Sequence, residues 1–109
     1  MSPLIARLWE GSTRAADADP YLKYLTRTGL ADYARTQGNR GVLTLRRRNP
    51  DRADFLLLSL WQSEAAIRAF AGEAPLRARF YPEDDRFLIR RDEEVRHFEL
   101  VHHSGITVP

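Results

Sequence analysis

The chain of 109 residues has no cysteine, a single lysine and no long hydrophobic run. Without cysteine it cannot form disulfides, thiolate metal sites or a cysteine nucleophile, and this composition fits a reducing compartment. No apolar segment approaches the roughly 18 residues that a membrane span requires, and the opening MSPLIARLWEG has no basic segment before an apolar stretch. We therefore expect a cytoplasmic protein with no membrane partner.

Positive charge is not concentrated on one surface. The formal net charge is only +2, and Asp and Glu are interspersed among the arginines. Arg46, Arg47 and Arg48 form the longest basic run, and alternation along a strand would divide them between two faces. Nucleic-acid-binding proteins usually carry a one-sided basic stripe, so we expect no nucleic acid partner.

What the chain does contain is an ordinary balance for a folded domain, with 43% hydrophobic and 29% charged residues. Its length fits one domain, which we place over residues 1–109. We expect residues 104–109 to form a loose tail or an extension exchanged with a partner.

The N-terminal half predicts one strand and one helix. Leu4–Trp9 is short and apolar, lies between Pro3 and Gly11, and places Ile5, Arg7 and Trp9 on one face. A helix should begin near Asp19-Pro20, with the Asp19 carboxylate accepting hydrogen bonds from free amides. Its buried side is predicted from helical spacing as Leu22, Leu25, Gly29 and Tyr33, with Tyr21, Tyr24 and Thr28 along the flank.

The C-terminal half predicts a hairpin, a second helix and a last strand. Val42–Arg47 and Phe55–Trp61 are strand-like and are joined through Asn49-Pro50-Asp51, a strong turn signal. Ser63 is a good helix cap and Gly72 a stop. Val95–His102 gives the final strand.

The resulting order is βαββαβ, an α+β ferredoxin-like arrangement with a four-stranded antiparallel sheet and both helices on one face. We place Phe55, Leu57 and Trp61 on the other, bare face. An apolar patch there would be unusual for a monomer, so we predict a homodimer that packs face to face.

Few side chains form a recognisable catalytic or metal motif. The histidines are His97 and the adjacent His102 and His103, whose side chains would point to opposite faces of a strand, so we expect no metal site. The acidic run at residues 83–85 lacks calcium-loop spacing and is interpreted as a solvated turn. No nucleophile elbow or glycine-rich phosphate loop is present in the sequence.

What remains is a mixture of aromatic and polar residues that suits an apolar pocket with a few orienting hydrogen bonds. The set is Arg7, Trp9, Tyr21, Tyr24, Trp61, Phe70, Phe80, Tyr81, His97 and Glu99, of which all but Tyr21 and Phe80 are predicted site residues. Each aromatic alone is more often core than site. Arg7 and Glu99 would also satisfy a simple cross-strand ion pair, and His97 an interface position.

Several segments, in order along residues 4 to 101, carry a family resemblance: ARLWEG, GLADYARTQGNRG, FLLLSLWQSEAAIRAFAG, FYPEDDRFL and VRHFELV. With them the chain resembles the antibiotic biosynthesis monooxygenase family, within the dimeric α+β barrel superfamily. The resemblance implies oxidation of aromatic anthrones or quinols by molecular oxygen, without metal or flavin, so no cofactor is expected.

On that resemblance, His97 is the candidate base. Arg7 and the Trp9 indole N–H would steady a developing oxyanion, while Trp61, Phe70 and Tyr81 wall the ring, with Tyr24 and Glu99 also binding substrate. The haem-degrading branch of the superfamily needs a first-strand asparagine, a tryptophan in the second helix and a histidine just beyond it. This chain has Phe70 at the helix position and no histidine between Trp61 and Arg96, so we expect no haem ligation of that kind.

Two functional interpretations remain open. One is a cofactor-free monooxygenase of small aromatic molecules, and the other is a non-catalytic dimeric barrel that binds a small hydrophobic ligand or a partner protein. RNA-recognition domains share the predicted topology. They need stacking aromatics on the central strands, which the segments LIARLW and DFLLLSLW do not supply in the required pattern.

Overall fold

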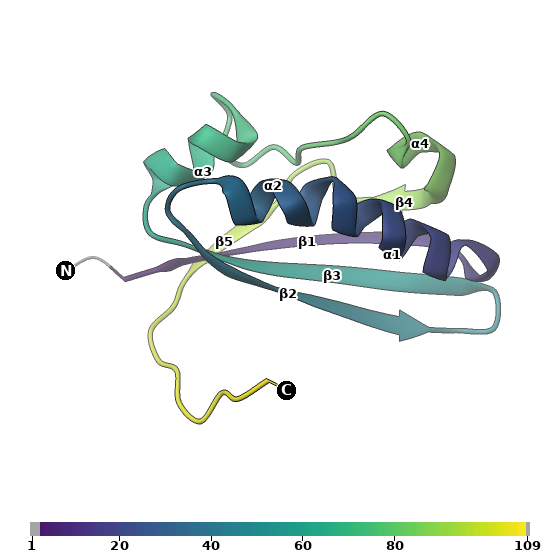
Figure 1. Cartoon of the computed structure of the whole chain (residues 1–109), viewed down its shortest axis with the longest axis horizontal. Helices are drawn as coiled ribbons and strands as arrows, with labels where there is room; N and C mark the ends of the chain where they lie inside the picture. Colours follow the sequence, from purple (N-terminus) through teal and green to yellow (C-terminus); the bar gives the residue numbers. More distant parts are fainter. Residues whose placement is uncertain (1–2, 109) are drawn as a thin grey trace.

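A computed structural model describes residues 3–108. One antiparallel sheet has the order β2-β3-β1-β4, with β5 also paired to β1, and helices cover one of its faces (Figure 1). The elements are β1 (Ile5–Arg14), a 3-10 turn (Ala15–Asp17), α1 (Ala18–Arg27), α2 (Gly29–Arg35), β2 (Asn39–Arg48), β3 (Arg52–Trp61), α3 (Glu64–Ala71), α4 (Asp84–Phe87), β4 (Leu88–Arg91) and β5 (Arg96–Glu99). The predicted ferredoxin-like fold is confirmed.

The central strand β1 runs past the predicted end at Trp9 to Arg14. It pairs along its whole length with β3, from Ile5 opposite Trp61 to Arg14 opposite Arg52. Gly11 does not end the strand. Instead, the Trp9 ring lies over it, and a β-carbon at Gly11 would overlap that ring.

The hairpin of β2 and β3 is confirmed, and both strands are longer than predicted. The basic run on β2 is divided between the two faces as expected. Arg46 and Arg48 form ion pairs with Asp19 of α1, whereas Arg47 pairs with Asp54. Asp19 therefore binds arginine side chains, and the prediction that it caps the helix is wrong. Asp19 lies inside α1, and the N-cap residue, Asp17, makes no side-chain hydrogen bond to the helix.

The fourth position of the sheet is divided between two short strands. β4 pairs with residues 11–13 of β1, and β5 pairs with residues 5–8. The predicted strand Val95–His102 is thus shorter in the structure. After Leu100, whose amide donates to the Leu4 carbonyl at 2.9 Å, residues 101–108 are exposed and leave the sheet on the side away from the helices (Figure 1).

The first predicted helix is interrupted at Thr28, whose backbone angles (φ −112°, ψ −92°) separate α1 from α2. Gly29, the weak helix former after the break, begins α2. The buried side of α1 is broader than the periodicity predicts, because Tyr21 and Tyr24 are core residues that are 1% and 4% exposed, and do not lie on a flank.

The second predicted helix is confirmed as α3. The Ser63 hydroxyl accepts from the Ala66 amide at 3.1 Å, and Gly72 ends the helix with a φ of 95°. The sequence did not predict α4 or β4. The acidic run interpreted as a solvated turn is partly a helical turn, and Asp84 at its start is buried.

The prediction of which sheet face Phe55, Leu57 and Trp61 occupy is wrong. All three point beneath the helices and are at most 4% exposed. Both faces of β3 are apolar in sequence, so alternation alone could not orient it. The open face instead carries leucines from three strands and one phenylalanine from β5: Leu8, Leu43, Leu45, Leu56, Leu58, Leu60 and Phe98.

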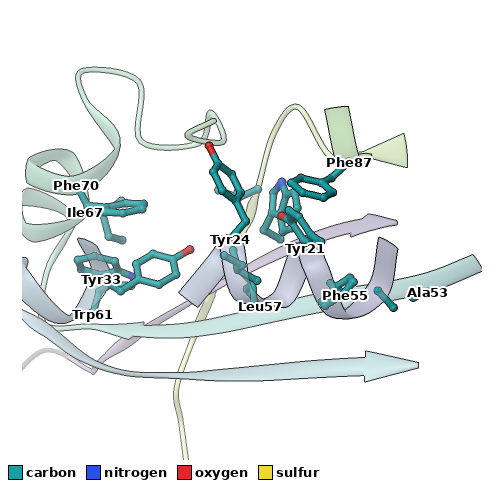
Figure 2. Close-up of a cluster of buried hydrophobic side chains, with 14 residues drawn as sticks. Tyr21, Tyr24, Tyr33, Ala53, Phe55, Leu57, Trp61, Ile67, Phe70 and Phe87 are labelled. Carbon is teal, nitrogen blue, oxygen red and sulfur yellow. The ribbon is translucent and has the colours of Figure 1, made fainter. Parts of the chain in front are cut away.

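The core between helices and sheet contains two aromatic groups (Figure 2). In the first group, Tyr33, Trp61 and Phe70 pack with ring centroids 4.5–5.8 Å apart. The second group consists of Tyr21, Tyr24, Phe55 and Phe87, with centroids 5.0–5.7 Å apart. Over residues 3–108, no helix has the length and apolar character needed to cross a membrane.

We expect Ser63→Ala to lower the free energy of unfolding by ~1 kcal/mol, because the Ala66 amide loses its cap. Urea unfolding followed by circular dichroism measures the change. Ser104→Ala, in the exposed C-terminal segment, is the matched control. Equal midpoints for the two variants would show that the cap contributes nothing.

Candidate functional site

A cavity lies between the two aromatic groups, with the sheet as its floor and α1 and α2 on one side. Its lining residues come from β1, β3, the helices and the segment after α3: Arg7, Trp9, Tyr21, Leu25, Gly29, Tyr33, Leu57, Phe70, Ala78, Arg79, Tyr81, Asp84 and Val95. The cavity volume is only about 30 Å³, enough for one or two water molecules. Four predicted site residues line it: Arg7, Trp9, Phe70 and Tyr81.

Arg7 is a buried cation, 2% exposed, on the central strand. Its guanidinium donates to the Pro75 carbonyl and to the Arg77 carbonyl at 3.0 Å, and lies 5.9 Å from the centre of the Phe70 ring. Its Nε atom is buried without a hydrogen-bond partner, and among residues 3–108 no carboxylate forms a salt bridge with it. Burial lowers the pKa of Arg7, but a guanidinium remains charged. The cavity therefore has an uncompensated positive charge in its wall.

His97 lies opposite Arg7 on β5, and its Nε2 is 3.3 Å from the Arg7 Nη1. The imidazole lines a shallow groove with Pro75 and Glu64 and does not line the cavity. Burial, followed by the neighbouring Arg7, lowers the pKa of His97 below its ordinary value of 6.5. A neutral imidazole is thereby favoured beside the guanidinium.

The segment after α3 closes the cavity through Arg79 and Tyr81. The Arg79 guanidinium lies 5.0 Å from the ring centres of both Phe70 and Tyr81, and it forms an ion pair with Asp32 at 3.1 Å. The Tyr81 hydroxyl donates to the same carboxylate at 2.7 Å. Asp32 on α2 thus holds both covering side chains in place.

Trp9 and Tyr33 are two aromatic residues of the wall that also carry a polar group. The Trp9 indole N–H donates to the Asp92 carbonyl at 3.0 Å, so the ring faces the cavity while the donor is already used. Burial raises the pKa of Tyr33, and the nearby Arg7 opposes that shift. The Tyr33 phenol therefore stays neutral.

Besides Arg79, Asp84 is a charged lining residue that sequence reasoning missed. It is 5% exposed, and one carboxylate oxygen accepts from the Tyr81 amide at 2.7 Å. Its other oxygen accepts no hydrogen bond from residues 3–108. Burial raises the pKa of Asp84 above its ordinary 3.8, while the Tyr81 amide and then Arg91 act against the rise. Its position in an acidic run gave no signal of burial.

The remaining predicted site residues lie outside the cavity lining. The Tyr24 hydroxyl accepts from the Glu83 amide at 2.9 Å and its ring packs on Phe87. Trp61 is fully buried behind Tyr33 and Phe70 and donates to the Ser59 hydroxyl at 2.9 Å. Glu99 is exposed at the end of β5, opposite Ile5 in the strand register and not opposite Arg7.

The fold matches solved structures over almost its full length. A protein of the antibiotic biosynthesis monooxygenase family from Nitrosomonas europaea has a TM-score of 0.67 at 15% identity, over 96% of this chain and 97% of that one. SnoaB, a cofactor-independent oxygenase from Streptomyces nogalater, has a TM-score of 0.56 at 14% identity, over 97% and 98%. The haem degrader MhuD from Mycobacterium tuberculosis, with two haems bound in its active site, has 0.58 at 19% identity, over 93% and 99%.

No protein-family model matches the sequence, and no curated protein matches it. At these identities the structural likeness establishes the fold, and it agrees with the family resemblance of the sequence. A shared fold does not determine the chemistry of a site.

The cavity does not fit haem. Its volume is far below that of a porphyrin, and its lining residues include no histidine, since His97 lines the separate groove. In the described part of the chain, no three His, Asp or Glu side chains are grouped closely enough to hold a metal ion.

The raised pKa of Asp84 gives a stability prediction with a definite sign. The folded state binds the Asp84 proton more tightly than the unfolded chain, so stability falls as pH rises through the folded pKa. Asp84→Asn, which keeps an oxygen for the Tyr81 amide, should therefore raise the melting temperature by a few degrees at neutral pH. The gain should shrink as the pH is lowered toward 3.8.

Asp85→Asn is the matched control, because the Asp85 side chain is 84% exposed and pairs with Arg91 on the surface. Differential scanning calorimetry over a pH series measures both variants. A lower melting temperature for Asp84→Asn at neutral pH would contradict the burial argument.

Proposed function

We propose that the chain is a cofactor-independent monooxygenase that oxidises a small aromatic substrate of the anthrone or quinol type with molecular oxygen. The observation that carries the proposal is a cavity walled by aromatic rings around the uncompensated Arg7 guanidinium. The fold shared with a cofactor-independent oxygenase supports it.

The chemistry suits such a wall. An anthrone that loses a ring-adjacent proton becomes an electron-rich anion able to reduce oxygen directly, so the protein has to bind, deprotonate and shield it. In the overall reaction the methylene carbon loses two hydrogens and gains one oxygen atom, and the second oxygen atom leaves as water. Arg7 faces the cavity where the anion would form and would lower its energy.

Substrate entry requires movement of the segment after α3, because about 30 Å³ cannot hold a ring system. Arg79 and Tyr81 are the covering groups, and the Arg79 side chain is 38% exposed. Surface ion pairs such as Arg79–Asp32 contribute little free energy, so displacing them is feasible. On this proposal Phe70 and Tyr81 bind the ring.

The roles suggested for His97 and Trp9 need further steps. His97 contacts the cavity only through Arg7, and the Trp9 indole N–H would have to release the Asp92 carbonyl to meet an oxyanion. We propose that Trp9 contributes its ring and that His97 positions Arg7. The hydrogen bonds of Arg7 with His97 and of Trp9 with Asp92 would equally stabilise the alternative, a non-catalytic barrel that only binds a hydrophobic molecule.

Oxygen consumption with a panel of anthrones and hydroquinones tests the proposal, and we expect stoichiometric uptake of one O₂ per anthrone. Gly29→Ala is the matched variant, because its methyl group would meet Leu25 and Tyr81 at ordinary contact distances of 3.5–3.6 Å. It fills cavity space while favouring the helix by roughly 0.4–1 kcal/mol. It should therefore weaken substrate affinity several-fold without loss of stability. Binding without uptake by the parent protein would favour the non-catalytic interpretation.

We also propose a homodimer formed through the open face of the sheet. Leu43, Leu45 and Phe98 are 41%, 49% and 51% exposed there, next to further leucines of β1 and β3. A face of this kind can supply the roughly 800 Å² per partner of a standard interface. The C-terminal segment leaves the sheet away from the helices (Figure 1) and contains the exposed residues Val101, Ile106 and Val108.

Leu45→Glu should convert the dimer to a monomer, because two copies of the new carboxylate would be buried in the interface without a partner. Leu76→Glu is the control: Leu76 is equally exposed, at 50%, but follows α3 on the helix side. Light scattering at micromolar concentration measures the mass. A monomeric parent protein would reject the dimer.

A further inference from the structure

We propose that Asp84 is the proton acceptor of the cavity and that Arg7 holds the anion which proton removal creates. This inference rests on the proposed function and specifies its ligand as an aromatic molecule with an acidic O–H or C–H group. It assigns the base to a residue that neither the sequence motifs nor the family resemblance indicates.

The geometry that carries the inference is a pair of opposite charges that line one cavity without neutralising each other. Arg7 lies beside Tyr33 and Phe70, in the first aromatic group. Asp84 starts α4 beside the second group, where its charge acts on Tyr21. Arg7 comes from β1 and Asp84 from α4, and among residues 3–108 no salt bridge joins the two side chains.

The hydrogen bonding of both groups leaves capacity for a ligand. Arg7 has a buried Nε–H with no partner, and Asp84 has one carboxylate oxygen that accepts nothing from residues 3–108. A buried donor without a partner and a largely buried carboxylate without a salt bridge both destabilise a fold, so their presence in one cavity indicates a site for a ligand that pairs with both. An aromatic acid does so: its proton passes to the free Asp84 oxygen, and its electron pair remains on the ring facing Arg7.

His97 is less suited to this transfer. Its Nε2 is directed at the Arg7 guanidinium 3.3 Å away, and the ring lines the outer groove. The groups that face Asp84 are Tyr21 from α1, the Tyr81 amide, Arg91 from β4 and the neighbouring Asp85. None of these is a better base than a buried carboxylate at neutral pH.

The first experiment compares Asp84→Asn with Asp85→Asn in oxygen uptake with an anthrone. We expect Asp84→Asn to lower kcat at least a hundredfold, as loss of a general base does, while the affinity for anthraquinone, which has no proton to give, stays within about twofold. Asp85→Asn should match the parent protein. The parent kcat/KM should rise with pH through the ionisation of Asp84, and this limb should be absent from Asp84→Asn.

Unchanged turnover in Asp84→Asn would overturn the inference and leave the proposed function intact. The inference would also be overturned if His97→Gln, which keeps Asp84, lost both turnover and the rise of kcat/KM with pH, because the base would then be the imidazole.

A second experiment does not depend on oxygen chemistry. Just above the pKa of para-nitrophenol, binding of its phenolate should protonate Asp84, because an anion in the cavity disfavours a second negative charge. Calorimetry in two buffers should show uptake of up to one proton by the parent protein and by Asp85→Asn, with the visible phenolate band retained, and none by Asp84→Asn. Proton uptake on binding para-nitrophenolate, together with no oxygen consumption on the panel of anthrones and hydroquinones, would refute the proposed function but support the acid–base pair. Binding without proton uptake would overturn the inference.

Discussion

A guanidinium with no counter-ion, enclosed between a sheet and the segment after α3, is the constraint on which the site depends. Arg7 reaches from the central strand to the carbonyls of Pro75 and Arg77, and so fixes that segment over the sheet. The same segment then supplies Ala78, Arg79 and Tyr81 to the cavity. One side chain thus determines both where the cavity lies and what charge it carries.

Burying such a charge is costly, and the structure meets the cost only in part. Carbonyl oxygens and the Phe70 ring solvate most of the guanidinium, but the Nε–H has no partner. Asp84 carries the opposite charge, and among residues 3–108 only one of its carboxylate oxygens accepts a hydrogen bond and no salt bridge pairs it. A fold optimised for stability alone would bring the two together or replace both with apolar groups. Their separation is therefore most simply understood as a property of the site.

The sequence predicted the fold well because its local signals agree. The turn at Asn49-Pro50-Asp51, the Ser63 cap and the Gly72 stop all appear where expected. The sequence prediction failed where both faces of a segment are apolar, and where the burial of a residue depends on its tertiary contacts and not on a periodic pattern. β3 could not be oriented, since Leu56, Leu58 and Leu60 compete with Phe55, Leu57 and Trp61 for the helix side.

Site prediction followed the same division. Arg7, Trp9, Phe70 and Tyr81 were found by chemical type and line the cavity, whereas Tyr24 and Trp61 serve the core. Asp84 could not be found, because its burial comes from the packing of α4 against the tyrosines of α1, a long-range contact with no periodic trace in the sequence. The sequence did not decide which face of the sheet His97 occupies; the structure pairs it with Arg7, on the helix side, where it lines a groove and not the cavity.

The broken fourth strand has a consequence for assembly. One border of the sheet is divided between β4 and β5, and the other border, β2, carries Arg40 and the run of Arg46, Arg47 and Arg48. Interrupted or densely charged borders are poor templates for an incoming strand. Lateral growth into a continuous ribbon, the first step toward a fibril, is therefore disfavoured at both borders. Self-association is then left to the leucine-rich open face, through which we propose the homodimer.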